Sequence, residues 1–80
     1  MTKYIFRKST RKNKKYDVFN TKGEYIVSFG DKRYQQYEDK IGAYSHLDHK
    51  DDLRRYRYYK RFGIDAEEGT AKYFSNHYLW

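Results

Sequence analysis

Aliphatic side chains are scarce in this chain, and this scarcity limits the folds open to it more than any other feature. Only nine residues are Ile, Val or Leu, and no cysteine is present to form a disulfide or a thiolate zinc site. With 80 residues the chain is also near the lower size limit for a stable single core. The core must therefore come from aromatic rings, chiefly the eleven tyrosines, whose hydroxyl groups need hydrogen-bond partners. We expect one small domain over residues 1–80.

The first thirty residues predict a three-stranded antiparallel β-meander. Large apolar and polar residues alternate in KYIFRK and KKYDVF, and EYIVSFG is rich in β-branched and aromatic residues. Between them, STRKN is expected to form a hairpin loop, and NTKG has the Asn and Gly of a tight turn. One face of the meander should carry five large side chains, namely Tyr16, Val18, Tyr25, Val27 and Phe29. A meander alone is too thin to be stable, so this face needs a cover.

The second part of the chain predicts that cover as two C-terminal α-helices, which makes the fold class α+β. The division lies between a basic meander, residues 1–30, and a helical cover, residues 31–80. Asp48 is the expected N-cap of the first helix, which should stop at Gly63. Thr70 is the expected cap of the last helix, AKYFSNHYLW.

The stretch RRYRYYKR, residues 54–61, separates aromatic rings from charge on a helical wheel. The aromatic side carries Tyr56, Tyr59 and Phe62, and we expect these rings to pack on the sheet. Tyr58 lies at the edge of this side.

The opposite side of the same wheel is cationic. Arg54, Arg57 and Arg61 lie there at spacings i, i+3 and i+7, so they could contact successive phosphates or an acidic partner. The alternative is pairing within the protein, between Asp51 and Arg54 or Arg55, and between Arg61 and Glu67 or Glu68.

The positive charge is concentrated near the N-terminus. The net charge is +7, and eleven basic residues balance eleven acidic ones from Asp17 onward, so the excess lies in the first sixteen residues. Such a cluster favours polyanions, above all nucleic acid, although a solvated surface that aids solubility is the alternative. From this cluster and the adjoining strand we predict six binding residues: Arg7, Lys8, Arg11, Lys12, Lys14 and Lys15.

Catalytic motifs are missing from the sequence. There is no nucleophile elbow, phosphate-binding glycine loop or acidic metal cluster, and His46 and His49 lack a clear third metal ligand. His77 is expected to pack in the core. We therefore expect no enzymatic activity, no metal or other cofactor and no small-molecule substrate. No apolar run approaches the roughly 18 residues of a membrane span, and the N-terminus lacks a signal peptide, so no membrane partner is expected.

Four blocks of the sequence resemble a family of small, mostly uncharacterised proteins encoded by tailed phages and giant double-stranded DNA viruses. These blocks are KSTRKNKKY, FGDKRYQQY, HKDDLRRYRYYKRFG and AKYFSNHYLW. The third matches the family's spacing at His49, Lys50, Asp51, Arg54, Tyr58 and Arg61. The chain departs from the family in carrying Phe62 where phage forms often have His, and in a longer IGAYSHLD insert before the block. The resemblance implies a viral origin and a part in the viral particle.

Together these features predict a small basic viral structural protein, associated with the virion or with DNA packaging. Its partner would be nucleic acid, bound without sequence specificity because residues 54–61 offer Arg, Lys and Tyr rather than side chains that read base edges. An acidic viral structural protein is the other predicted partner, and a homo-oligomer is compatible with the sequence. The expected location is the virion or the interior of the host cell, in cytoplasm or nucleus. The alternative function is a free intracellular nucleic-acid-binding regulator of a DNA virus.

Overall fold

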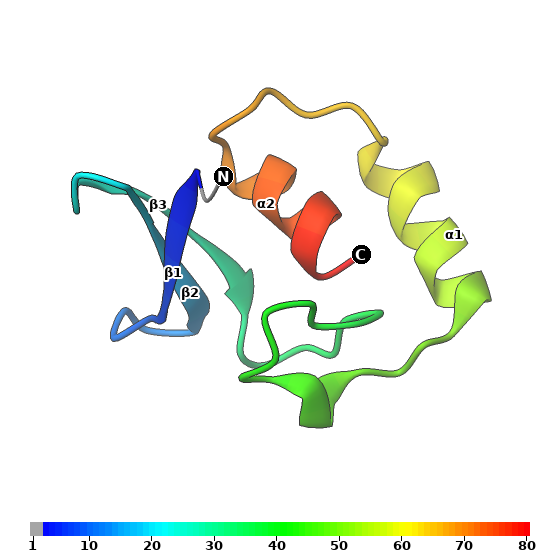
Figure 1. Ribbon diagram of the computed structural model, residues 1–80. Helices are drawn as coiled ribbons and strands as arrows, with labels where there is room; N and C mark the ends of the chain where they lie inside the picture. The colour runs from blue at the N-terminus through cyan, green and yellow to red at the C-terminus, as the bar shows by residue number, and fades with distance from the viewer. Residues whose placement is uncertain (1–2) are drawn as a thin grey trace.

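The computed structural model describes residues 3–80, so the first two residues of the predicted meander lie outside the described part. The elements are, in chain order, the strands β1 (Tyr4–Lys8), β2 (Lys14–Asn20) and β3 (Tyr25–Asp31), the 3-10 turn η1 (Ser45–Leu47), and the helices α1 (Asp52–Phe62) and α2 (Ala71–Tyr78). The strands form one antiparallel sheet in the order β1-β2-β3 (Figure 1). The predicted α+β class, a three-stranded antiparallel sheet followed by two helices, is confirmed.

The β2–β3 turn forms as predicted, but the strand register places one aromatic residue differently. The Gly23 amide donates to the Asn20 carbonyl oxygen at 3.0 Å, and Gly23 has a φ of 85° that suits glycine. Val18 pairs with Val27 in the core, and a bulge then shifts the register. Because an extra residue reverses the alternation of side chains, Tyr25 is 45% exposed and lies on the outer face of the sheet. The prediction that Tyr25 belongs to the core face is wrong.

Aromatic rings form the core, and α2 supplies the central one. The Phe74 ring is fully buried, with its centroid 4.9 Å from that of Tyr4, 6.0 Å from Phe6 and 5.7 Å from Phe29. These partners come from β1 and β3, so one side chain holds the helix against two strands. Among residues 3–80 the buried apolar and aromatic residues are Tyr16, Val18, Phe29, Tyr44, Phe74 and Leu79.

The N-terminal end of α2 confirms the predicted cap. The Thr70 hydroxyl accepts a hydrogen bond from the Tyr73 amide at 3.2 Å. His77, in contrast, is exposed, and its ring lies beside that of Tyr73 on the preceding turn of α2, at a centroid distance of 4.2 Å. The prediction that His77 packs in the core is therefore wrong.

A buried carboxylate closes the core beside β2. Asp39 accepts hydrogen bonds from the Tyr16 hydroxyl and from the backbone amides of Ile41, Gly42 and Tyr44. Burial alone would raise the pKa of Asp39, but these hydrogen bonds outweigh it and hold the pKa below its ordinary value. Burial and the bond to Asp39 also raise the pKa of Tyr16, so this hydroxyl stays protonated. A core built from tyrosine thus carries its own polar partner.

The helix α1 begins three residues later than predicted. Its N-cap is Asp51, whose carboxylate accepts hydrogen bonds from two backbone amides of the first turn. The carboxylate of Asp48 is already engaged, because it accepts hydrogen bonds from the Gln36 amide group and from the Asp39 backbone. The stop at Gly63 is confirmed, since its amide donates to the Tyr59 carbonyl oxygen at 2.7 Å.

The helix α1 does not lie on the sheet, and in Figure 1 α2 stands between them. None of its residues is fully buried, and Tyr56 and Phe62 are 62% and 50% exposed. Its aromatic side contacts the C-terminal segment instead: the Tyr58 ring stacks on Trp80 at 4.4 Å, and the Tyr59 hydroxyl donates to a backbone oxygen of α2 at 3.0 Å. The prediction that the aromatic side of α1 packs on the sheet is wrong, because α2 already covers that part of the sheet.

Candidate nucleic-acid interface

The loop between β1 and β2 presents three of the predicted cations to solvent. Arg11, Lys12 and Lys14 are all exposed. The loop is closed by a hydrogen bond from the Lys14 amide to the Arg11 carbonyl oxygen at 3.3 Å, with Asn13 in a left-handed conformation at φ 62°. The Arg11 guanidinium lies over the ring of Tyr25, 4.6 Å from its centroid. This tip is the exposed cationic loop that the sequence predicts.

Lys15, the fourth cation of this cluster, is not part of the surface. Its side chain is 2% exposed, and its ammonium group donates to the backbone oxygen of Tyr34 at 3.0 Å and to the side chain of Gln36. Burial lowers the pKa of Lys15. Gly30 permits this burial, since a Cβ there would lie 3.0 Å from the Lys15 side chain. The prediction that Lys15 binds a partner is wrong, because the segment after β3 covers it.

The two predicted cations on β1 are exposed but lie on opposite faces of the strand. The Arg7 guanidinium lies over the Phe19 ring at 5.3 Å, on the outer face of the sheet. The Lys8 ammonium lies over the Tyr44 ring at 5.3 Å, on the core side. Arg7 therefore shares a face with Arg11, whereas Lys8 does not.

The arginines of α1 are exposed, and within residues 3–80 none of them forms an ion pair with an Asp or Glu side chain. Among residues 3–80 the ion pairs are Lys3 with Glu68 and Arg33 with Asp31. The alternative of internal pairing, between Asp51 and Arg54 or Arg55 and between Arg61 and Glu67 or Glu68, is thus not observed within that part of the chain. Arg54 instead donates to the side-chain oxygen of Gln35 at 2.8 Å. These guanidinium groups remain able to bind an external anion.

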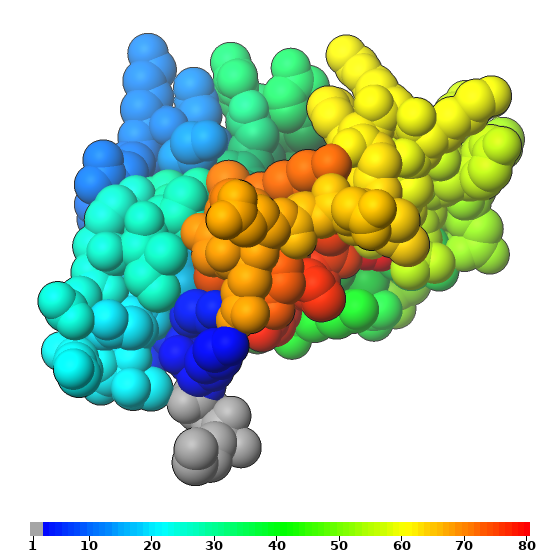
Figure 2. Space-filling model, turned by 90° about the horizontal axis from the view of Figure 1, so that it is seen from above, coloured from blue at the N-terminus to red at the C-terminus, as the bar shows by residue number. Residues whose placement is uncertain are grey.

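The turn after β3 connects the hairpin loop to α1. The Lys32 amide donates to the Asn13 carbonyl oxygen at 3.0 Å, and the Lys32 ammonium donates to the backbone of the hairpin loop at 3.3 Å. On its other side this turn contacts α1 through the bond between Arg54 and Gln35. In Figure 2 the hairpin loop (mid-blue), the turn (green) and the end of α1 (yellow) project along the same side of the molecule.

These three segments carry exposed cations along one side of the molecule, and we call this surface the basic edge. Its members are Arg11, Lys12, Lys14, Lys32, Arg33, Arg54, Arg57 and Arg61. Sequence reasoning missed Lys32 and Arg33, although the run DKR at the end of a predicted strand was a signal that could have found them. Neither the charge nor the periodicity of the sequence could show that the turn after β3 lies between the hairpin loop and α1.

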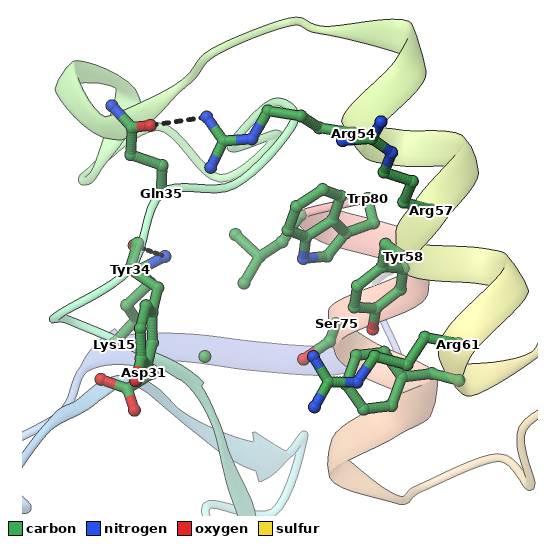
Figure 3. A pocket seen from close by; sticks show the side chains of 13 residues that line it. Lys15, Asp31, Tyr34, Gln35, Arg54, Arg57, Tyr58, Arg61, Ser75 and Trp80 are labelled. Atoms are coloured by element: carbon green, nitrogen blue, oxygen red, sulfur yellow. Dashed lines mark hydrogen bonds between the residues drawn. The ribbon is translucent and has the colours of Figure 1, made fainter.

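A cleft of about 620 Å³ opens between α1 and the turn after β3 (Figure 3). Arg54, Arg57 and Arg61 line one wall, while Tyr34 lies on the other and Trp80 on the floor. The stacked rings of Tyr58 and Trp80 also line the cleft.

The charge balance of this cleft favours anions. Its one lining carboxylate in the described chain is Asp31, which accepts two hydrogen bonds from the Arg33 side chain and one from the Arg33 backbone. These bonds from Arg33 lower the pKa of Asp31 to about 2, so its charge is present and already matched. The α1 arginines therefore dominate the field of the cleft. Within residues 3–80, no group of three potential ligands is placed to hold a metal ion.

Comparison with known proteins finds no relative of this chain. No family model, curated protein or solved structure matches the chain. The resemblance to proteins of tailed phages and giant viruses therefore stays a prediction. In the described part of the chain, none of the helices is both long and apolar enough to cross a membrane.

Proposed function

We propose that this protein is a non-enzymatic small basic viral structural protein, associated with the virion or with DNA packaging, that binds nucleic acid through its basic edge. The observation that supports this most is that few cations of the basic edge are paired with a carboxylate of the same protein. The basic edge has eight cations, and within residues 3–80 only Arg33 among them forms an ion pair with a carboxylate. Surface cations without acidic neighbours attract a polyanion and release its condensed counterions on binding.

The arrangement on α1 suits a phosphate backbone. Arg54 and Arg61 are two turns apart, about 10.5 Å along the helix axis, with Arg57 between them. Each planar guanidinium can form two parallel hydrogen bonds to a phosphate. Such contacts position a nucleic acid without reading its sequence, so we expect similar affinity for duplexes of unrelated sequence.

Removing the α1 arginines tests this proposal. In Arg54→Gln/Arg57→Gln/Arg61→Gln the slope of log affinity against log salt should fall by about 2.7 on duplex DNA, or about 0.9 per lost phosphate contact. The matched control is Lys22→Gln/Lys40→Gln/Lys50→Gln, which removes the same charge from exposed positions outside the basic edge. Fluorescence anisotropy gives both slopes, and circular dichroism shows that each variant is folded.

Two results would contradict the binding proposal. One is an unchanged salt slope in the arginine variant, and the other is an equal loss in the lysine control. If DNA fails to bind at low salt while polyglutamate binds through the same arginines, the partner is an acidic protein surface instead.

The association with a viral particle is supported by the resemblance of the four sequence blocks. Mass spectrometry of purified virions tests it directly, and we expect the protein at high copy number in the particles. Absence from particles, together with cross-linking to nucleic acid in infected cells, would favour the free regulator.

A further inference from the structure

The cleft beside α1 has the size and access of a ligand site. Its volume of about 620 Å³ lies within the usual range for small-ligand pockets, about 300–1,000 Å³. Its walls come from two segments of the basic edge, so a polyanion bound there passes directly over its mouth. In Figure 3 the side chain of Arg54 extends across the cleft toward Gln35, and that of Arg61 extends toward Ser75.

Two exposed aromatic residues line this cationic cleft. Tyr34, on the turn after β3, is 63% exposed, and Phe62, at the end of α1, is 50% exposed. Neither ring belongs to the core, whereas the stacked rings of Tyr58 and Trp80 are occupied in holding α1 in place. An exposed ring beside unpaired guanidinium groups matches a ligand with a flat aromatic part and a phosphate.

We infer that the cleft binds one unpaired nucleotide of a single-stranded nucleic acid, with its phosphate on the α1 arginines and its base stacked on Tyr34 or Phe62. This inference rests on the proposed nucleic-acid binding and adds a preference for single strands. A duplex keeps its bases stacked inside the helix and cannot insert one without unpairing it. The basic edge then attracts both forms, and the cleft distinguishes them.

Four probes measured at one salt concentration test the preference. They are a thymidine strand of about 12 nucleotides, within the usual site sizes for single-strand binders, an abasic strand of the same length, a duplex of the same length, and thymidine monophosphate. We expect the thymidine strand to bind about tenfold more tightly than the abasic strand or the duplex, and the monophosphate to bind far more weakly than the strand. The abasic strand keeps the phosphates, so the comparison isolates the base.

A pair of matched variants assigns the preference to the cleft. Tyr34→Leu should weaken binding of the thymidine strand about fivefold or more, through loss of base stacking, and leave the abasic strand unchanged. Tyr56→Leu is the control, since Tyr56 is also an exposed tyrosine, 62% against 63%, but lies outside this cleft. Because both side chains are exposed, neither change should unfold the protein. If Phe62 is the stacking ring, Phe62→Leu shows the selective loss instead.

The outcomes separate this inference from the proposed function. Equal affinity for the thymidine and abasic strands, or equal effects of Tyr34→Leu, Phe62→Leu and Tyr56→Leu, overturns the cleft while polyanion binding stands. Monophosphate binding as tight as that of the strand overturns the single-strand assignment and makes the cleft a site for free nucleotides. Failure of every probe to bind at low salt overturns both proposals.

Discussion

The helices α1 and α2 start from similar local signals and end in different environments. Each has a side chain that caps its first turn, Asp51 or Thr70, and each is rich in aromatic residues. Yet α2 buries Phe74 completely against the sheet, while α1 buries no residue fully. The difference lies in charge: α1 carries five basic residues in eleven, and α2 carries only Lys72 and His77 in eight. A helix with cations on so much of its surface cannot enter the centre of a small core.

This comparison teaches that an aromatic stripe on a helix does not by itself place that helix on a sheet. The sheet is small, and α2 uses the face that the meander offers (Figure 1). The helix α1 is left to pack on α2 and Trp80 through Tyr58 and Tyr59. Because α1 lies at the periphery, its arginines stay outside the core and line the cleft. The helix that packs less tightly is therefore the one that contributes to the candidate site.

The largest effect should come from breaking α2 away from the sheet. Phe74→Ala removes a fully buried ring and should lower the free energy of unfolding by about 3–5 kcal/mol, through lost burial and a cavity. A domain of this size has little stability to spare, so the variant should be largely unfolded at room temperature. The matched change on the other helix, Tyr56→Ala, should stay within about 0.5 kcal/mol. Urea denaturation measures the free energy of unfolding of both variants. Equal losses in the two variants would show that α1 and α2 contribute equally to stability.

A smaller and pH-dependent effect should come from the carboxylate that closes the core around α2. At pH 7, Asp39→Asn should lower the free energy of unfolding by about 2 kcal/mol, because four donors lose a charged acceptor. The folded-state pKa of Asp39 is depressed, so its contribution is complete above the unfolded-state pKa and is lost as the pH falls through the folded-state pKa.

The difference in stability between wild type and Asp39→Asn should therefore shrink as the pH falls below about 4. Urea denaturation at several pH values measures this difference. The pH-dependent contributions of the other carboxylates cancel in the difference because both proteins contain them. A difference that stays constant down to pH 2 would contradict the assigned role of the charge.

The smallest effect should come from loosening α1 alone. Tyr58→Leu removes the stack on Trp80 and should lower the global free energy of unfolding by only about 1 kcal/mol. Amide hydrogen exchange should accelerate in α1 while the protection of β2 and β3 changes little, because α1 packs outside the main core. Equal acceleration in the sheet would mean that α1 and α2 form one cooperative unit. Wild-type protein at the same pH is the reference for both regions.

The candidate site was predictable in its charges but not in its assembly. Arg11, Lys12 and Lys14 at the hairpin tip, and Arg57 and Arg61 on α1, are exposed as the local patterns indicate. The turn that joins them was not found, because its position depends on hydrogen bonds between segments far apart in sequence. Trp80 was likewise not identified as a residue that lines the cleft.

The sequence alone determined the elements whose causes are local. The turn before β3, the stop at Gly63 and the cap at Thr70 depend on neighbouring residues, and all three occur as predicted. Only the tertiary structure decided where those elements lie. Lys15 is buried because a later segment covers it, and α1 stands off the sheet because α2 occupies the available face. Local preferences depend on a few neighbouring residues. Which helix covers the small apolar face of the sheet depends instead on the packing of the whole chain.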